Sequence, residues 1–319
     1  MNALPQTIRP VSFDGYGADF EAFSQALGDS FARYGFAVIS DHGLPQARVE
    51  AALGAAKAFF ALPEARKLAY KLPVAGQRGY TPFGVETAKG ATHYDLKEFW
   101  HVGRDLPAGH PFRAHMADNI WPDADVPGFH EAVGWLYGAL DSMGLKVLEA
   151  IAAWLGLERH FFDPTVDVGN SVLRLLHYPP TPAEGPHERA AAHEDINVIT
   201  LLLGAEEAGL EVKDRSQGEG GGRWIAINPP PGALVCNIGD MLQRLTNHRL
   251  PSTSHRVVNP PPERRGVARY STPFFLHFNS DYLIRTLPNC VDAAHPDRYP
   301  QPITANDYLQ ERLREIKLA

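Results

Sequence analysis

The sequence is poor in the features of secreted and membrane proteins. Only two of its 319 residues are cysteine, Cys236 and Cys290, which is too few for a disulfide framework. Both have apolar neighbours, so we expect buried, reduced thiols. No apolar run approaches the roughly 20 residues of a membrane span, and the N-terminus lacks the basic and apolar stretches of a secretory signal. These absences favour a cytoplasmic protein with no membrane partner.

An excess of positive charge is also missing. The net charge is −7 at pH 7, and the pI is near 6.0. No run of Lys or Arg forms the basic footprint that binds nucleic-acid phosphates. We therefore expect no nucleic-acid partner and a small-molecule substrate instead. Nothing in the pattern indicates an oligomeric state.

The first half of the chain is dominated by helical periodicity. Apolar residues recur at helical spacing in four segments, which are residues 17–35, 45–60, 63–71 and 128–155. The segment between residues 72 and 127 is rich in Gly, Pro and His, with one strand signal at 98–102. We therefore divide the chain into an N-terminal region, residues 1–127, and a core, residues 128–319, on which that region packs.

Beyond residue 170 the pattern changes to short apolar runs between Pro and Gly turns. This spacing is typical of an antiparallel β-sandwich or barrel rather than of βαβ units. The predicted strands cover residues 172–176, 196–203, 210–212, 224–227, 233–238, 255–258 and 267–276. Residues 218–222 predict a flexible glycine turn, and residues 304–316 a closing amphipathic helix. The expected fold class is α+β with a mainly β core.

A candidate metal site begins at His193 and Asp195, two residues apart ahead of an apolar run. Side chains alternate between the two faces of a strand, so an extended segment would project both ligands to the same side. One more imidazole would complete a facial triad, which leaves adjacent coordination positions open for Fe(II) oxygen chemistry. A lone His-x-Asp pair is common by chance, so its neighbourhood must support it.

Two histidines compete for the third ligand position, His248 and His255. His255 opens a β-branched run and is therefore expected on a strand, whereas His248 lies in the preceding turn. We favour His255. His177, His187 and His277 are interpreted as surface, hydrogen-bonded or packing histidines.

Arg269 and Ser271 form a second pair with the spacing of one strand face. A guanidinium offers a planar donor fork that matches a carboxylate, and a serine hydroxyl adds another donor. Inside a barrel this pair could bind the distal carboxylate of a dicarboxylic acid. An isolated Arg-x-Ser is more often a surface arginine beside a turn serine.

Taken together, these motifs resemble the isopenicillin N synthase-like branch of the 2-oxoglutarate/Fe(II) dioxygenases. The resemblance extends through Trp224–Leu242, Leu245–Asn247 and Ser252–Val257, and near the N-terminus through Ala32–Gly43 and Arg78–Tyr80. It therefore spans nearly the whole chain. It implies a double-stranded β-helix (jelly roll) with a helical N-terminal extension and a C-terminal helix.

The resemblance also implies the roles of the site residues. His193, Asp195 and His255 would bind Fe(II), while Arg269 and Ser271 would hold the 5-carboxylate of 2-oxoglutarate. Tyr178 matches a tyrosine that often helps to bind this co-substrate. O₂ is the other co-substrate, and ascorbate can act as reductant in such enzymes.

Two positions depart from the family pattern. Leu176 stands where many members have an asparagine, and His248 replaces the glycine of an Asn-Gly turn. The first departure removes a polar contact to the co-substrate. The second leaves His248 either reaching towards the site or holding the turn, and we favour the turn.

The expected activity is oxidation, chiefly hydroxylation, of a small organic molecule, coupled to decarboxylation of 2-oxoglutarate to succinate. The same fold also admits oxidases that do not use 2-oxoglutarate, and ethylene formation. Two remoter alternatives are a zinc hydrolase, which also uses two histidines and a carboxylate, and a jelly-roll binding module without catalysis. Candidate residues lining a substrate site are Tyr80, Phe83, Phe99, Leu210, Val212, Phe275 and His277.

Overall fold

The structure is a computed structural model, and it describes residues 8–73, 78–85, 95–180, 189–203, 208–215 and 222–315. Its helices are α1 (Asp14–Ala18), α2 (Phe20–Tyr34), α3 (Gln46–Phe60), α4 (Glu64–Leu68), α5 (Phe129–Trp154), α6 (Asp163–Val166), α7 (Asp240–Leu245) and α8 (Ala305–Glu315). The strands of the first half are β1 (Pro10–Ser12), β2 (Phe36–Ser40), β3 (Gly79–Thr81) and β4 (Glu98–Gly103). Those of the second half are β5 (Val172–Tyr178), β6 (Ala190–His193), β7 (Ile199–Leu203), β8 (Leu210–Lys213), β9 (Trp224–Ala226), β10 (Leu234–Ile238), β11 (His255–Val257), β12 (Arg269–Leu276), β13 (Leu283–Ile284) and β14 (Ile303–Thr304).

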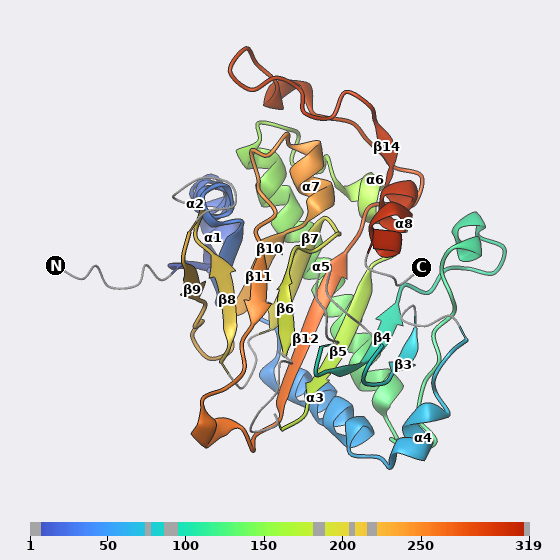
Figure 1. Cartoon of the computed structure of the whole chain (residues 1–319). Helices are drawn as coiled ribbons and strands as arrows, with labels where there is room; N and C mark the ends of the chain where they lie inside the picture. Colours follow the sequence, from blue (N-terminus) through green and yellow to red (C-terminus); the bar gives the residue numbers. More distant parts are fainter. Residues whose placement is uncertain are drawn as a thin grey trace.

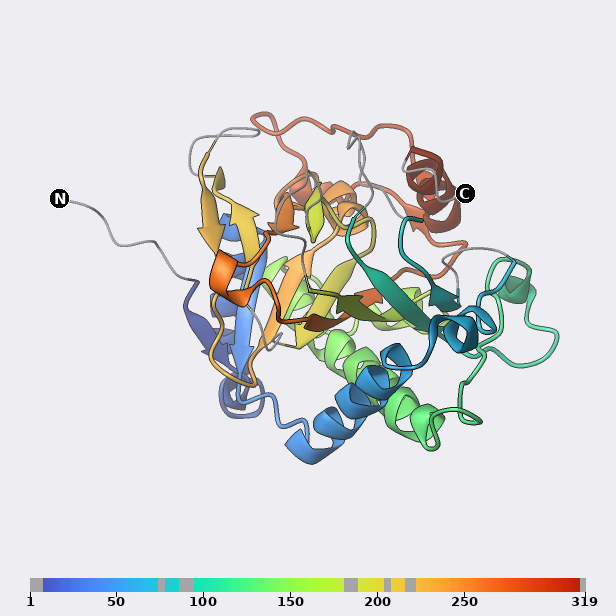
Figure 2. The same cartoon turned by 60° about the horizontal axis from the view of Figure 1, so that its bottom comes forward.

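Two sheets form the β core (Figure 1). The larger has eight strands in the order β1-β2-β10-β7-β12-β5-β4-β3, and the smaller has four in the order β6-β11-β8-β9. All pairings in these two sheets are antiparallel except that between β1 and β2. Figure 2 shows the smaller sheet standing against the larger one. The predicted α+β fold with a jelly-roll core, N-terminal helices and a C-terminal helix is confirmed.

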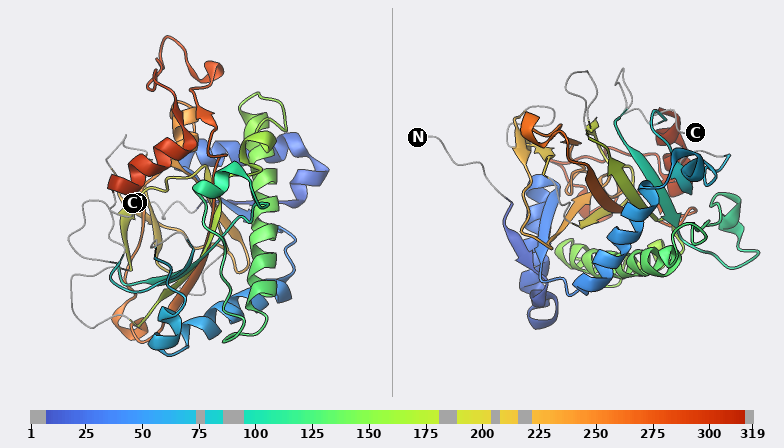
Figure 3. Two further views of the ribbon diagram at one scale, coloured as in Figure 1. Left: turned by 90° about the vertical axis from the view of Figure 1, so that its right-hand side faces the viewer. Right: turned by 90° about the horizontal axis from the view of Figure 1, so that it is seen from below.

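The two faces of the eight-stranded sheet have different neighbours. One face, which we call the interior face, is defined by strand pairing, which places a set of β5 and β12 residues on the same side. These residues are Arg174, Leu176 and Tyr178 of β5 and Arg269, Ser271 and Phe275 of β12. The alternate residues form the outer face, which packs on α5 (Figure 3). The rings of Phe274 on β12 and Tyr137 on α5 lie 5.1 Å apart there.

The predicted helices are present with shifted ends. The segment 17–35 contains all of α2, which begins after Asp19 because this side chain accepts a hydrogen bond from the amide of Ala22. Gly35 ends α2 with φ +70°, and a side chain here would lie within 2.6 Å of the Pro251 carbonyl oxygen. This close approach brings the end of α2 against the segment that leads to His255.

Strands β1 to β4, from the first 127 residues, lie in the same sheet as β5, β7, β10 and β12. The division into an N-terminal region, 1–127, and a core, 128–319, stays a prediction. Most of the predicted glycine turn at 218–222 lies outside the described residues, as does His187. Within the described ranges, no helix is long and apolar enough to cross a membrane.

Candidate metal centre and co-substrate face

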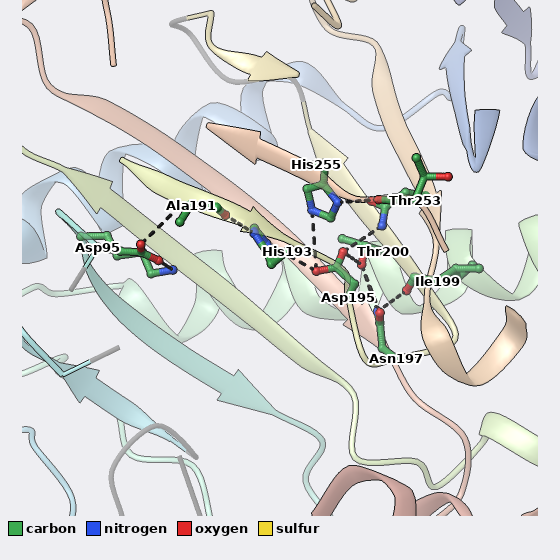
Figure 4. Close-up of polar contacts among 11 residues, drawn as sticks. Asp95, Ala191, His193, Asp195, Asn197, Ile199, Thr200, Thr253 and His255 are labelled. Carbon is green, nitrogen blue, oxygen red and sulfur yellow. Dashed lines mark hydrogen bonds and ion pairs between the residues drawn. The ribbon is translucent and has the colours of Figure 1, made fainter. Parts of the chain in front are cut away.

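Three side chains converge between the two sheets (Figure 4). His193 is the last residue of β6, and His255 is the first residue of β11, which pairs with β6 so that the two histidines lie opposite each other. Their ring centres lie 4.4 Å apart. Asp195 Oδ1 lies 3.9 Å from His193 Nε2 and 3.8 Å from His255 Nε2. One ligand atom from each of the three lies within 4.8 Å of the others, so together they could hold a metal ion.

The backbone of the His-x-Asp pair differs from the prediction. β6 ends at His193 and β7 begins at Ile199, so Asp195 lies in the turn between a strand of each sheet. The prediction that both ligands project from one continuous strand was therefore wrong. The turn still brings both side chains together, while Glu194 between them is exposed.

Each imidazole is oriented by a backbone carbonyl. His193 Nδ1 lies 2.7 Å from the Ala191 oxygen, and His255 Nδ1 lies 3.1 Å from the Thr253 oxygen. A carbonyl accepts only, so Nδ1 carries the proton and Nε2 keeps the lone pair that faces Asp195. Such outer contacts fix the tautomer and ring orientation that a metal ligand needs.

Asp195 is oriented by two side chains of the larger sheet. Its Oδ2 accepts hydrogen bonds from the hydroxyl of Thr200, at 2.6 Å, and from the amide nitrogen of Asn237, at 2.8 Å. This leaves Oδ1 directed at the two imidazoles. The sequence interpretation had not identified Thr200 or Asn237. Their interior position on β7 and β10 follows only from the register between the strands.

Short helix α7 fixes the turn that holds Asp195. The backbone amide of Asp240 donates to the backbone carbonyl oxygen of Asp195 at 2.7 Å, and the backbone amide of Met241 donates to that of Asn197 at 3.1 Å. Asp240 itself is buried, and its carboxylate lies 3.1 Å from the guanidinium of Arg312 on α8. A continuous set of contacts therefore links the C-terminal helix to the Asp195 backbone.

The electrostatics favour the protonation states that bind metal. Burial, reinforced by the charge of His255, lowers the pKa of His193 to about 4. Burial alone would raise the pKa of Asp195, but the two imidazoles and the hydrogen bonds from Asn237 and Thr200 hold it below its ordinary value. A neutral imidazole and a charged carboxylate are the forms that ligate a divalent ion. Two imidazoles and one carboxylate on one side of an ion also match the donor set of non-haem Fe(II) oxygenases.

Arg269, Ser271 and Tyr178 lie together on the interior face, and the shared strand face predicted for Arg269 and Ser271 is confirmed. Arg269 pairs with Tyr178 across β12 and β5, and its guanidinium carbon lies 5.2 Å from the Tyr178 ring centre. Arg269 is only 2% exposed. Ser271 is buried two residues along β12, opposite Leu176. A buried cation with hydroxyl groups beside it is suited to a carboxylate.

The two departures from the family pattern have clear surroundings. Leu176 lies in an apolar cluster with Phe99 and Tyr178, so this position contributes packing. His248 has φ +67° after Asn247 with φ +50°, and its Nε2 is hydrogen-bonded to the Tyr299 hydroxyl. His248 therefore holds a turn against the C-terminal segment, as favoured, and is absent from the group of metal-ligand atoms.

The predicted substrate-lining residues are split between different surfaces. Phe99, Phe275 and His277 belong to the interior side, whereas Tyr80 bonds to Glu98 on the outer face. Phe83 lies near His177, also on the outer side. The two candidates on β8, Leu210 and Val212, pack in an apolar cluster with residues of β2 and β10.

Two family models match this chain. Residues 169–278 match the family described as 2OG-Fe(II) oxygenase superfamily. Residues 9–124 match the family described as non-haem dioxygenase in morphine synthesis N-terminal.

Individual relatives cover nearly all of the chain. The 2-oxoglutarate-Fe(II) type oxidoreductase hxnY of Emericella nidulans is 35% identical over 92% of this chain and 86% of its own length. A crystal structure of a 2OG-Fe(II) oxygenase family protein from Caulobacter crescentus is 68% identical, with a TM-score of 0.90 over 97% of this chain and 99% of that one. Neurospora crassa T7H, solved with alpha-KG and thymine, is 29% identical, with a TM-score of 0.84 over 98% of each chain.

Family models, relatives and the convergent His-x-Asp…His group agree with one another, and Fe(II) and 2-oxoglutarate are the cofactor and co-substrate of this family. The chain therefore belongs to the 2OG-Fe(II) oxygenase superfamily, in its isopenicillin N synthase-like branch, and is a 2-oxoglutarate/Fe(II)-dependent oxidoreductase.

Proposed function

We propose that this enzyme hydroxylates a small organic molecule at iron held by His193, Asp195 and His255. The observation that carries the proposal is the convergence of these three groups, two of them buried, each oriented by its own hydrogen bonds. When iron and 2-oxoglutarate are bound, reaction with O₂ decarboxylates 2-oxoglutarate to succinate and supplies the oxidant. The protein's part is to hold the ligands, orient both organic molecules and exclude water.

We assign the 5-carboxylate of 2-oxoglutarate to Arg269 and Ser271, with Tyr178 beside them. Burial strengthens this assignment because a charge-assisted hydrogen bond gains strength where water is excluded. Leu176 supplies no polar contact, so the carboxylate contacts at the other end of 2-oxoglutarate depend on the metal and on residues of other strands.

Relatives support a small-molecule substrate. T7H from Neurospora crassa binds thymine alongside alpha-KG, and the Proline hydroxylase buaE of Petromyces alliaceus is 34% identical over 92% of this chain. We place the enzyme in the cytoplasm. The two thiols, Cys236 and Cys290, are buried and not joined to each other, which fits a reducing compartment.

An anaerobic titration of the apoprotein with Fe(II) and 2-oxoglutarate tests the proposal. We expect one iron per chain and a visible absorption band that requires both ligands. Small metabolites are then screened for stimulation of O₂ uptake, with succinate measured in the same reaction. Succinate formed in step with oxidised product supports the hydroxylase.

Other outcomes separate the remaining activities of the same fold. O₂ uptake and product without succinate would identify an oxidase that does not use 2-oxoglutarate, and ethylene in the headspace would identify ethylene formation. Turnover that continues under strict anaerobiosis would contradict an oxygenase altogether.

A further inference from the structure

A second arginine lies on the interior face, away from the co-substrate residues. Arg174 stands on β5, four residues from Tyr178, which is roughly 13 Å along a strand. Its Nε donates a hydrogen bond of 2.6 Å to His101 Nε2 on the neighbouring β4. The two guanidinium groups of this face, Arg174 and Arg269, therefore arise from opposite ends of β5 and its partner strand. A short diacid such as 2-oxoglutarate, anchored at Arg269, does not explain why a second arginine, Arg174, lies on this face.

Aromatic rings fix the orientation of Arg174. Its guanidinium carbon lies 4.3 Å from the ring centre of Phe99 and 5.3 Å from that of Phe275. Cation–π contacts and the bond to His101 restrain a long side chain that would otherwise lose much rotamer freedom on binding a ligand. Arg174 and Phe275 are both only partly buried, unlike their outer-face neighbours Leu173 and Phe274.

Strand pairing connects this arginine to the metal centre. Phe275 is the cross-strand partner of Thr200, and the Thr200 hydroxyl donates to Asp195. Arg174 is two strands away from Thr200 and two residues farther along, which is roughly 10 Å across the strands and roughly 7 Å along them. A molecule of modest size could therefore contact Arg174 at one end and present a C–H bond to the metal at the other.

Among the described strand residues of the eight-stranded sheet, the interior face carries cations and no carboxylate. In the eight-stranded sheet the single acidic strand residue is Glu98, and it points to the outer face. A further cation, Arg78, is 2% exposed and lies against the Cα of Gly103 on β4, with its Nη2 bonded to Asn170. Gly103 is the cross-strand partner of Val172, which is in turn the partner of Phe275, so the side of Gly103 that Arg78 covers is the interior one.

We infer that Arg174, supported by His101 and Arg78, is the subsite for a carboxylate of the primary substrate, which is thus a small organic acid with an apolar or aromatic body. The assignment rests on the proposed hydroxylase function and specifies its substrate class. The guanidinium fork matches a carboxylate, and the rings of Phe99 and Phe275 suit the apolar part next to it.

The experiment uses matched acids and amides as probes. Benzoate, phenylacetate, cinnamate and hexanoate, each beside its primary amide, are titrated into the anaerobic Fe(II)/2-oxoglutarate enzyme, with thymine as a neutral heterocycle. Perturbation of the visible band reports binding without turnover. We expect at least one acid to bind about tenfold more tightly than its amide, the size of one charge-assisted hydrogen bond.

Three variants assign that preference to a residue. Arg174→Gln should reduce the acid-to-amide ratio to about two- or threefold, while Arg174→Lys should retain part of it, since the charge is kept without the fork. Arg314→Gln, an exposed position on α8, is the matched control and should keep the full ratio. All three variants should keep the visible absorption band that requires both Fe(II) and 2-oxoglutarate, here called the 2-oxoglutarate band.

Several results would overturn the inference. They are equal binding of acids and amides by the unchanged enzyme, binding of no acid at all, preference for thymine over every acid, or a ratio that survives in Arg174→Gln. In each of these cases the 2-oxoglutarate band is still present. Failure of the proposed function is separate, because the band itself would then be absent.

Discussion

The two faces of the eight-stranded sheet are built from alternate residues of the same strands, yet they serve different functions. On β5 the interior residues Arg174 and Tyr178 are directed to the site, whereas His177 and Leu175 between them pack outward. The interior face concentrates cations and aromatic rings around the metal group. The outer face packs on α3 and α5 and confines its charge to one buried cluster. A shift of one residue in register would exchange the two sets.

That outer cluster is centred on Glu98, which is 1% exposed. Its carboxylate accepts hydrogen bonds from Lys67, at 2.7 Å, and Tyr80, and pairs with His177 Nδ1 at 2.7 Å. His177 is stacked on Tyr270, with ring centres 4.8 Å apart. The comparison predicts that interior substitutions change ligand binding and turnover, and that outer substitutions change stability with little effect on either.

The largest expected effect comes from removing a metal ligand. Asp195→Ala and His255→Ala should each abolish substrate-coupled succinate formation, because the remaining two ligands hold iron poorly. Iron content after anaerobic loading checks this. His248→Ala is the control, since His248 bonds to Tyr299 instead. If His248→Ala lost its iron while His255→Ala kept it, the choice of third ligand would be wrong.

Next in size is the outer-face substitution Glu98→Gln. It leaves Lys67 buried without its carboxylate, so we expect about 3 kcal/mol less stability against urea at pH 7. The 2-oxoglutarate KM should stay within about twofold of normal, because the interior face is untouched. Glu158→Gln, an exposed change, is the control and should alter neither quantity. A large rise in KM would break the division between the faces.

The stability effect of Glu98 should also depend on pH. Burial alone would raise the pKa of Glu98, but hydrogen bonds from His177, Lys67 and Tyr80 hold it below its ordinary value of 4.5. A depressed carboxylate pKa stabilises the fold above pH 4.5, and this contribution is lost as the pH falls through the lowered pKa. The difference in unfolding free energy between the unchanged enzyme and Glu98→Gln should therefore narrow as the pH falls below 4.5. A constant gap would show that packing, not charge, is responsible.

A smaller effect is expected for Arg269→Ala on the interior face. Loss of a charge-assisted carboxylate contact should raise the apparent KM for 2-oxoglutarate roughly 10- to 100-fold, with iron content unchanged. Arg269→Lys should recover part of the loss, and Arg264→Ala, at an exposed position, should have no effect. An unchanged KM in Arg269→Ala would remove the carboxylate-anchor assignment.

The smallest effect tests how far the C-terminal helix supports the metal turn. Arg312→Gln removes the guanidinium that pairs with the buried carboxylate of Asp240. The backbone amide of Asp240 donates a hydrogen bond to the backbone carbonyl oxygen of Asp195. We expect iron affinity to fall about threefold to tenfold, less than the roughly 10- to 100-fold lost when a group bonded directly to a metal ligand is removed, because Arg312 acts through Asp240. Arg314→Gln on the same helix should leave affinity unchanged. A loss of thermal stability with normal iron affinity would mean that Arg312 serves the fold alone.

Local patterns were enough to predict much of the site. His255 was preferred to His248 because it opens a β-branched run, and the structure places it at the start of β11 beside His193. The two-residue spacing of Arg269 and Ser271 correctly predicted a shared strand face. The same rule was wrong for His193 and Asp195, because β6 ends between them and the chain crosses from one sheet to the other.

Contacts between distant segments could not be read from such patterns. Thr200 and Asn237 orient Asp195 only because β7 pairs with β10 in one register. His101 meets Arg174 because β4, from the first half of the chain, lies beside β5. The sequence showed each of these residues as an ordinary strand residue.

The sequence by itself determined the order of helices and strands, the donor types at the metal and the family, because periodicity and ligand chemistry are local properties. Only the tertiary structure decided which residues surround those donors and which face of each strand meets the site. The reason is physical: interior positions are assigned by strand register and by closure of two sheets, and both depend on the packing of the whole core.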